Sequence, residues 1–101
     1  MAKWADYLIS AVRYNEKKTH IEMVRVHEDL GDKVGSSTDI ARGIVITSIK
    51  NGNSYVTIFK AANGNWQRGE DVRIITVNGE EFLRTDANEK ASDNLGNLPE
   101  F

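Results

Sequence analysis

The sequence contains no cysteine and a single proline among its 101 residues. A chain without cysteine can form no disulfide, no thiolate zinc site and no cysteine nucleophile, and a reducing compartment fits that composition. No apolar run approaches the roughly 20 residues needed to span a bilayer, and the first residues lack the apolar core of a secretory signal. We therefore expect a cytoplasmic protein that makes no use of the membrane.

Positive charge is not in excess either. The formal net charge is −2, whereas nucleic-acid binders usually carry a basic stripe because phosphate contacts dominate their affinity. The hydrophobic fraction of 40% and the charged fraction of 28% are ordinary for a globular domain. The length suits one domain, so we expect a single domain over 1–101, with a core over about 5–85 and an extended C-terminal strap over 86–101.

The first half of the chain predicts an antiparallel hairpin. Residues 7–14, YLISAVRY, and 19–28, THIEMVRVHE, are rich in aromatic and β-branched types and are separated by the polar turn 15–18. The apolar phase of the second strand slips by one residue at Met23-Val24. That slip indicates either a strand covered on both faces or a β-bulge.

A helix is predicted next, within STDIARGIVITSIKNG. Ser37 or Thr38 suits its N-cap, and Gly52 suits a left-handed C-terminal cap. The apolar stripe at helical spacing consists of Ile40, Ile44, Val45 and Ile49. A strand over 44–49 is the competing interpretation, because the run 44–47 is β-branched and Gly43 weakens helicity.

Three further strands are predicted over 54–59, 71–77 and 80–85, with Asn78-Gly79 as the turn between the last two. Residues 61–70 read as a loop. The order is therefore β-β-α-β-β-β, an α+β domain in which a mostly antiparallel sheet carries one helix packed on a face.

Catalytic and metal-binding patterns are missing from the sequence. It contains no G-x-S-x-G, no phosphate-binding G-x-x-x-x-G-K and no H-E-x-x-H. His20 and His27 are seven residues apart on one predicted strand, an odd spacing that points them to opposite faces. We expect no enzymatic activity, no metal site and no cofactor.

Two stretches carry candidate binding residues. Trp66 and Arg68 lie in the predicted 61–70 loop, and Trp and Arg are enriched in binding hot spots, although a loop tryptophan can equally cap a core. The C-terminal DNLGNLPEF combines turn-forming residues with leucines. We expect Leu95 and Leu98 to be at least partly buried, Asp93 and Asn94 to fix the turn, and Arg73 or Arg84 to receive Asp93 or Asp86. If the segment is not docked, it orders only on binding.

These motifs together resemble a family of small bacterial and phage-borne domains with no assigned function. The resemblance rests on W-x-x-G-x-x-V at Trp66, Gly69 and Val72, and on a C-terminal pattern that maps to Leu83, Arg84, Thr85, Asp93, Asn94, Leu95, Leu98 and Pro99. It implies a fold and supplies no reaction.

The function we expect is that of a non-enzymatic protein-interaction module. Its partner would be an unidentified protein or a second copy, bound through Trp66, Arg68, Arg84, Asp93, Asn94 and Leu98. A nucleic-acid-associated domain is an alternative that is not favoured, with Arg13, Lys17, Lys18 and Arg25 on the first hairpin as its phosphate contacts. A small enzyme or ligand-binding protein is the third hypothesis, and it requires a pocket with converging polar groups.

Overall fold

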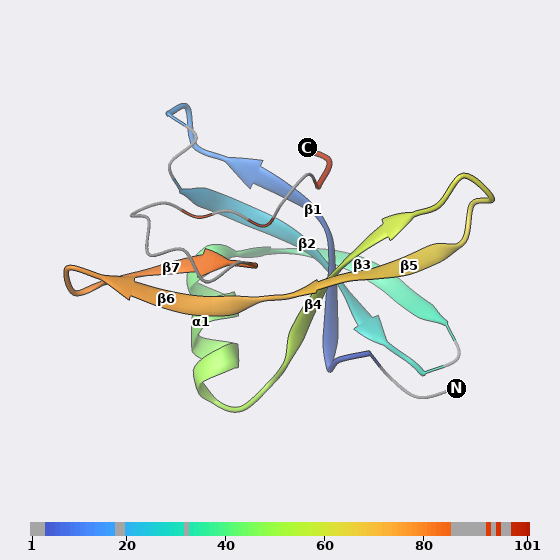
Figure 1. Ribbon diagram of the computed structural model, residues 1–101, viewed down its shortest axis with the longest axis horizontal. Coiled ribbons are helices and arrows are strands. Elements are labelled where there is room, and N and C mark those ends of the chain that lie inside the picture. The colour runs from blue at the N-terminus through green and yellow to red at the C-terminus, as the bar shows by residue number, and fades with distance from the viewer. Residues whose placement is uncertain (1–3, 18–19, 32, 86–92, 94, 96–97) are drawn as a thin grey trace.

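A five-stranded sheet and a separate two-stranded hairpin organise the chain (Figure 1). The computed structural model describes residues 4–17, 20–31, 33–85, 93, 95 and 98–101. Its elements are β1 (Tyr7–Tyr14), β2 (Ile21–Asp29), β3 (Val34–Ala41), α1 (Arg42–Lys50), β4 (Tyr55–Lys60), β5 (Trp66–Asp71), β6 (Arg73–Val77) and β7 (Glu80–Arg84). The α+β class predicted from the sequence is confirmed.

The large sheet has the order β3-β2-β1-β4-β5, which leaves β3 and β5 at its edges. Neighbouring strands are antiparallel except β1 and β4, which are parallel. A parallel pair needs a long crossover, and β2, β3 and α1 supply it. Only Val72 separates β5 from β6, so this ribbon leaves the large sheet and then forms the hairpin with β7.

Two bulges in the first hairpin decide which side chains face the helix. The register of β1 against β2 shifts between Ile9 and Ala11, so Ser10 is an extra residue in β1. The register shifts again between Arg13 and Tyr14, where Glu22 is an extra residue in β2. The phase slip seen near Met23 in the sequence is thus explained by a β-bulge at Glu22.

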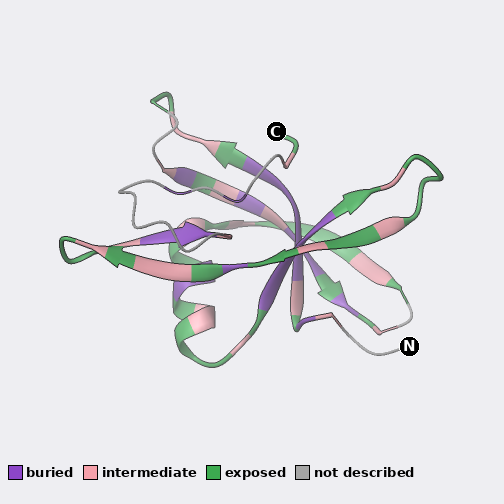
Figure 2. Cartoon of the chain, in the orientation of Figure 1, coloured by how far each residue is buried: buried purple, intermediate pink, exposed green. Residues whose placement is uncertain are grey.

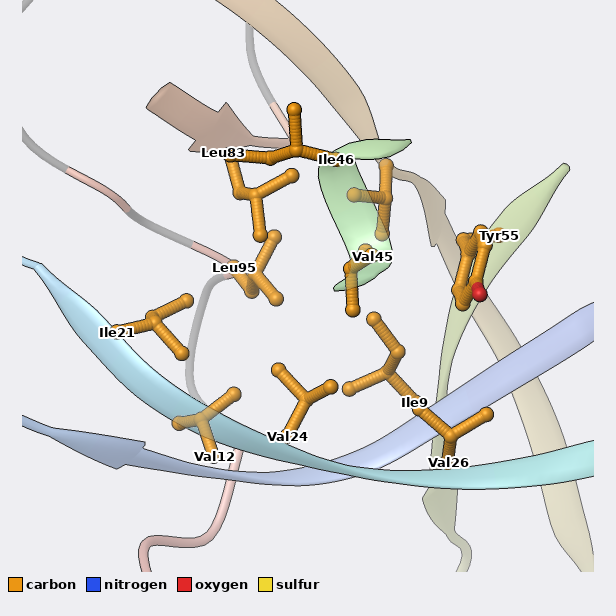
Figure 3. Close-up of a cluster of buried hydrophobic side chains, with 11 residues drawn as sticks. Ile9, Val12, Ile21, Val24, Val26, Val45, Ile46, Tyr55, Leu83 and Leu95 are labelled. Atoms are coloured by element: carbon orange, nitrogen blue, oxygen red, sulfur yellow. The ribbon is translucent and has the colours of Figure 1, made fainter. Parts of the chain in front are cut away.

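The main core lies between this sheet, α1, β7 and the C-terminal segment (Figure 3). The sheet contributes the isoleucines and valines of β1 and β2, and α1 contributes Val45 and Ile46. Leu83 of β7 and Leu95 close the cluster, at 0% and 2% exposure. Burial of such side chains stabilises a fold by about 1.5–3 kcal/mol each, so this cluster accounts for much of the stability of the domain.

The opposite face of the sheet carries a smaller cluster. Ala5, Leu8, Val56 and Ile58 are buried there, with Trp4, Val34 and Trp66 packed against them. The central strands of the sheet are mostly buried, whereas the edge strands β3 and β5 consist of exposed and intermediate residues only (Figure 2).

The predicted start of the helix is wrong. Residues 34–41 form β3 and pair with β2, and α1 begins only at Arg42. Ser37 and Thr38 therefore do not cap it, and the N-cap residue, Ala41, makes no side-chain cap hydrogen bond. Serine, threonine and aspartate suit a cap locally, but here the partner strand β2 determines their conformation.

The end of the helix is as predicted. Lys50 is its last residue, and Gly52 follows with a left-handed φ of 98°. The Gly52 N–H donates to the Ile49 carbonyl oxygen at 3.0 Å and the Asn53 N–H to the Ser48 carbonyl oxygen at 3.1 Å, so the residues after the helix bond its last carbonyls. Within the described residues, α1 is neither long nor apolar enough to cross a membrane.

A second strand was missed in the predicted 61–70 loop. Residues 66–71 form β5 and pair antiparallel with β4, and only the turn at 61–65 has no strand structure. The other predicted strands are present with ends shifted by a residue or two, and the hairpin turn at Asn78-Gly79 joins β6 to β7.

Candidate functional site

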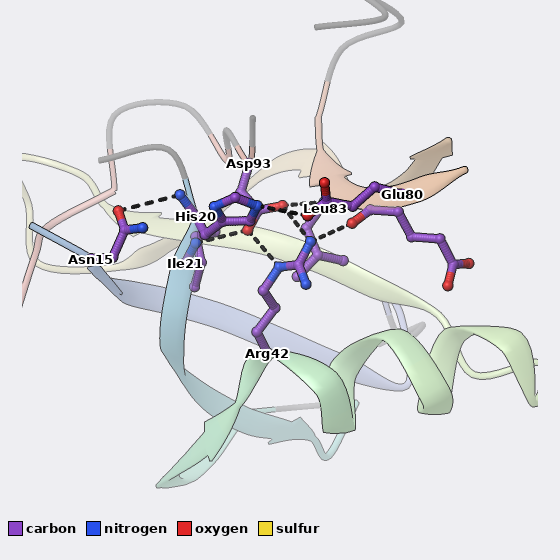
Figure 4. A network of polar contacts seen from close by, with 8 residues as sticks. Asn15, His20, Ile21, Arg42, Glu80, Leu83 and Asp93 are labelled. Carbon is purple, nitrogen blue, oxygen red and sulfur yellow. Dashed lines mark hydrogen bonds and ion pairs between the residues drawn. The ribbon is translucent and has the colours of Figure 1, made fainter. Parts of the chain in front are cut away.

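Asp93 lies inside the protein and joins three elements (Figure 4). Its side chain is fully buried, and Arg42, the first residue of α1, binds both carboxylate oxygens, at 2.6 Å and 3.1 Å. The backbone N–H groups of Ile21 and Leu83 each donate to it at 2.7 Å. Arg42 also donates to the Glu81 carbonyl oxygen. The carboxylate thus fixes α1 to the start of β2 and to β7.

The last residues of the chain pair with β1. The Val12 N–H donates to the Pro99 carbonyl oxygen at 2.9 Å, and the Phe101 N–H donates to the Val12 carbonyl oxygen at 3.0 Å. The Phe101 ring lies against two guanidinium groups, 4.8 Å from that of Arg13 and 4.4 Å from that of Arg25. This segment adds to β1 beyond the part that pairs with β4.

The burial predicted for the C-terminal leucines is confirmed. Leu95 is buried in the main core, and Leu98 is half-buried against it. Tyr14 also packs against that core, where burial raises the pKa of its phenol, and a hydrogen bond with the Leu95 backbone lowers it by less.

The candidate binding residues do not gather on one exposed surface. Arg84 and Asp93 are buried, at 2% and 3% exposure. Trp66 packs on the cluster of the opposite face from Leu98, and Asn94 lies outside the described residues. Arg68 is exposed on β5 and pairs with Asp71 at 2.7 Å. Asp93 pairs with Arg42, a partner that the sequence analysis did not consider, and Asp86 lies outside the described residues.

The basic residues of the first hairpin are partly occupied within the protein. Arg25 pairs with Asp39 at 3.0 Å, and it shares the Phe101 ring with Arg13. Lys17 is exposed, and Lys18 lies outside the described residues.

The two histidines have separate surroundings. His20 lies 3.0 Å from Glu80 at the surface. His27 is buried and lies below Trp66, with Nε2 2.7 Å from the Ser10 hydroxyl. Its Nδ1 lies 2.8 Å from the Gly35 carbonyl oxygen, and because a carbonyl only accepts, Nδ1 carries the proton. In the described part of the chain, no three His, Asp or Glu residues are grouped to hold a metal ion.

A groove of about 640 Å³ runs between α1 and the outer half of the sheet. Its lining is largely apolar and includes Tyr7, Val26, Leu30, Ile40, Ile44 and Tyr55. Tyr7 and Tyr55 stack at 5.1 Å. Burial raises the pKa of the Tyr55 phenol, and a hydrogen bond with Ser48 opposes this.

Polar groups lie along the side of the groove formed by β3. Ser36 and Thr38 of β3 line it, together with Ser48 of α1, and Glu28 of β2 is the one charged side chain among the described lining residues. Such a surface, with apolar walls and a few polar groups, suits ligands that are mostly apolar.

β3 forms the edge of the sheet beside this groove. Among the described residues it pairs with β2 alone, and its eight residues include no lysine, arginine or proline. Natural proteins usually protect an edge strand with such residues. The other edge, β5, carries Arg68, Glu70 and Asp71 along its length. The two edges therefore differ in charge, since β5 carries three charged residues and β3 carries one, Asp39.

Comparison with known proteins places the chain in a family. The family model described as "Protein of unknown function (DUF3892)" matches residues 8–99. The chain belongs to the DUF3892 family. The family without assigned function that the sequence analysis expected is thereby confirmed. Curated proteins and solved structures give no match.

The matched range of this DUF3892 protein runs from Leu8 to Pro99 and so includes Asp93 and Leu95. Of the motif residues that suggested the family, Val72, Leu83, Arg84, Asp93 and Leu95 are buried, so these five build the fold. Sequence reasoning missed the groove, because Leu30, Ile44 and β3 become neighbours only in the folded chain. Ile44 gave no signal, because in the sequence it belongs to the apolar stripe of the predicted helix, whereas the structure leaves it 56% exposed.

Proposed function

We propose that this DUF3892 protein is a non-enzymatic protein-interaction module that receives an extended segment of a partner along β3. One observation carries the proposal: an edge strand with a single charged residue, Asp39, and without lysine, arginine or proline borders a largely apolar groove. The partner segment would form a further strand of the sheet.

The edge strand and the groove would contribute different interactions to binding. The N–H and C=O groups on the outer side of β3, which pair with no other described strand, would provide backbone hydrogen bonds that depend little on the partner's sequence. Alternate side chains of an added strand point to the same face, so every second partner residue would enter the groove. A segment with apolar residues at alternate positions fits best, because Tyr7, Ile40 and Ile44 form the groove wall.

The chemistry of the polar groups supports a binding role over catalysis. The Asp93 carboxylate is occupied by Arg42 and two backbone N–H groups. The His27 ring is held between Ser10 and Gly35 beneath Trp66. Among the described residues that line the groove, Glu28 is the one carboxylate, and the phenols of Tyr7 and Tyr55 stack on each other.

The binding surface proposed here differs from the one suggested by the sequence. Arg84 and Asp93 are too deeply buried to contact a partner without unfolding. Trp66 packs against Leu8 and its neighbours, and its ring lies 5.6 Å from that of His27. Packing of that kind supports a structural role for Trp66.

Selection from a library of random peptides displayed on phage tests the proposal. The immobilised wild-type chain should enrich peptides with alternating apolar residues, and Ile44→Asp should not retain them. Phe59→Asp is the matched control, because Phe59 is also a large exposed apolar residue, at 48%, but lies on β4 outside the groove. It should bind the selected peptides as well as the wild type does, and so should Trp66→Ala.

Amide chemical shifts measured with and without a selected peptide show where the peptide binds. The shifts of β3 and of the first turn of α1 should move, and those of β5 should not. Peptides that bind Ile44→Asp as well as wild type, or that move only the 61–70 region, would refute the proposed site.

A further inference from the structure

Two segments share the edge of β1 that lies away from β2. β4 pairs with the first part of this edge, over Tyr7–Ile9. Farther along, the Val12 N–H donates to the Pro99 carbonyl oxygen and the Phe101 N–H donates to the Val12 carbonyl oxygen (Figure 1). A parallel strand bonds to its neighbour in this way, so the last residues of the chain occupy the position of a strand on this edge.

The side chains of this segment contact both faces of the sheet. Leu98 packs against the main core. Phe101 follows three residues later, an odd spacing that points it to the other face of an extended segment. Its ring contacts the guanidinium groups of Arg13 and Arg25, which are diagonal neighbours on one face because Arg25 is opposite Ala11.

The two arginines favour an aromatic ring at this position. A guanidinium group is attracted to the π face of a ring, and an aliphatic side chain has no such face. Arg25 is also paired with Asp39 at 3.0 Å, which orients its guanidinium group. The Arg13 Nε donates to the backbone oxygen of Phe101 at 3.0 Å, so one side chain contacts both the ring and the backbone of the segment.

The C-terminal residues are held at two depths. Asp93 and Leu95 are buried, at 3% and 2% exposure. Pro99 and Glu100 are exposed, and Phe101 is half-buried. In the part of the chain that the structure describes, this outer stretch joins β1 through one bridge. It can therefore leave β1 while the buried aspartate and leucine still close the core.

We infer that this part of the β1 edge is a second peptide-binding site, which residues 99–101 occupy within their own chain. When they leave, the edge takes an extended segment of a partner protein that runs parallel to β1. The segment that fits has an aliphatic residue followed three positions later by an aromatic residue, the spacing of Leu98 and Phe101. Because β2 lies between β1 and β3, the inference does not depend on the proposed use of β3.

Hydrogen exchange of the wild-type chain tests whether the outer residues leave on their own. The Val12 N–H is bonded to Pro99, whereas the Ile21 N–H is bonded to the buried carboxylate of Asp93. After correction for intrinsic rates, exchange at Val12 should be at least about tenfold faster than at Ile21, because local opening of an exposed end costs less than opening of the core. Equal corrected rates would show that 93–101 opens as one unit, and would overturn the inference.

A free peptide with the sequence of residues 96–101, GNLPEF, tests the site itself. The variant Phe101→Pro opens the site in the intact chain, because proline removes both the ring and the N–H that donates to Val12. A titration followed by amide chemical shifts should give a Kd at least about tenfold lower for this variant than for the wild type, in which the chain's own segment competes. The amides of Val12 and Arg13 should shift, and those of α1 should not.

Matched variants test the recognition of the ring. In the Phe101→Pro chain, Arg13→Ala should raise the Kd of the peptide at least about fivefold, because the ring contact and the bond to the backbone oxygen are both lost. Arg68→Ala, which removes an exposed arginine on β5, should leave the Kd unchanged. A peptide with leucine in place of its phenylalanine should bind the Phe101→Pro chain as weakly as the original peptide binds after Arg13→Ala. Circular dichroism checks that each variant is folded.

Each result decides for or against the inference. Absence of binding to Phe101→Pro, a Kd equal to that of the wild type, or a Kd that Arg13→Ala leaves unchanged would show that residues 99–101 only complete the sheet. Tighter binding that depends on Arg13 and on the aromatic ring supports the inference. The exchange measurement needs no variant, so it decides the question if Phe101→Pro does not fold. A failure here leaves the β3 site standing, because peptides bound there shift the amides of β3 and α1.

Discussion

Replacing Asp93 with alanine should cost this domain a large part of its stability. The carboxylate is fully buried and binds both nitrogens of the Arg42 fork as well as two backbone N–H groups. Alanine would leave a cation at the first turn of α1 without its partner. It would also leave the N–H groups of Ile21 and Leu83 without their acceptor.

The size of the stability loss follows from the groups that lose the carboxylate as their partner. Breaking a buried ion pair by removing one member costs about 3–5 kcal/mol, and each stranded backbone donor costs about 1–3 kcal/mol. Arg42 is 21% exposed, so water can solvate part of its charge. We therefore expect a loss of about 3–5 kcal/mol. A domain of this size has about 5–15 kcal/mol in total.

Urea unfolding followed by circular dichroism measures this loss. Asp71→Ala is the control, because Asp71 forms an exposed pair with Arg68, and exposed pairs contribute about 0–1 kcal/mol. Arg42→Ala combined with Asp93→Ala should cost less than the sum of the two single changes, since the pair is lost once. A loss at Asp93 no larger than that at Asp71 would refute the role assigned to the carboxylate.

Three further predictions concern local structure. Gly69→Ala should destabilise the fold by about 1–3 kcal/mol in urea unfolding, because its Cβ would lie 2.9 Å from the Thr57 carbonyl oxygen; unchanged stability would contradict the close packing of β4 and β5. Ala41→Ser should raise the free energy of unfolding by about 0.5–1 kcal/mol, because the N-cap of α1 has no side-chain acceptor. Thermal unfolding measures this gain. The control is Ala62→Ser, at an exposed position in the 61–65 turn. Burial raises the pKa values of Tyr14 and Tyr55 above the ordinary 10.0, so the folded state holds their protons more tightly than the unfolded state does. The free energy of unfolding should therefore be highest below pH 10 and should fall as the pH rises toward the folded-state pKa. Tyr55→Phe should flatten that alkaline loss, and an equal loss in the variant would rule out this phenol as its source.

The hairpins were predictable because their signals are local. The first hairpin, β1–β2, has dense β-branched runs on either side of a polar turn, and the Asn78-Gly79 turn supports both positive φ values on its own. The signal for the end of α1 is also local, since Gly52 adopts the left-handed conformation two residues after Lys50. In each case the interacting residues are close in sequence.

The edge strands were missed because nothing local makes them strands. β3 has a sequence that suits a helix cap, and β5 is polar and mostly exposed. Each is a strand because a neighbour, β2 or β4, provides its backbone partners. Gly69 illustrates the point, since its lack of a side chain matters only against Thr57 across the pair.

The candidate site likewise has features that local sequence predicts and features that only distant contacts determine. The sequence by itself determined an α+β domain without cysteine chemistry, and it predicted that Leu95 and Leu98 are at least partly buried. Only the tertiary structure decided that Asp93 meets Arg42 across 51 residues, and that Leu30, β3 and Ile44 line one groove. The physical reason is that hydrophobic pattern and turn chemistry act over a few residues. Ion pairing and edge exposure, in contrast, depend on which distant segments the folded core brings together.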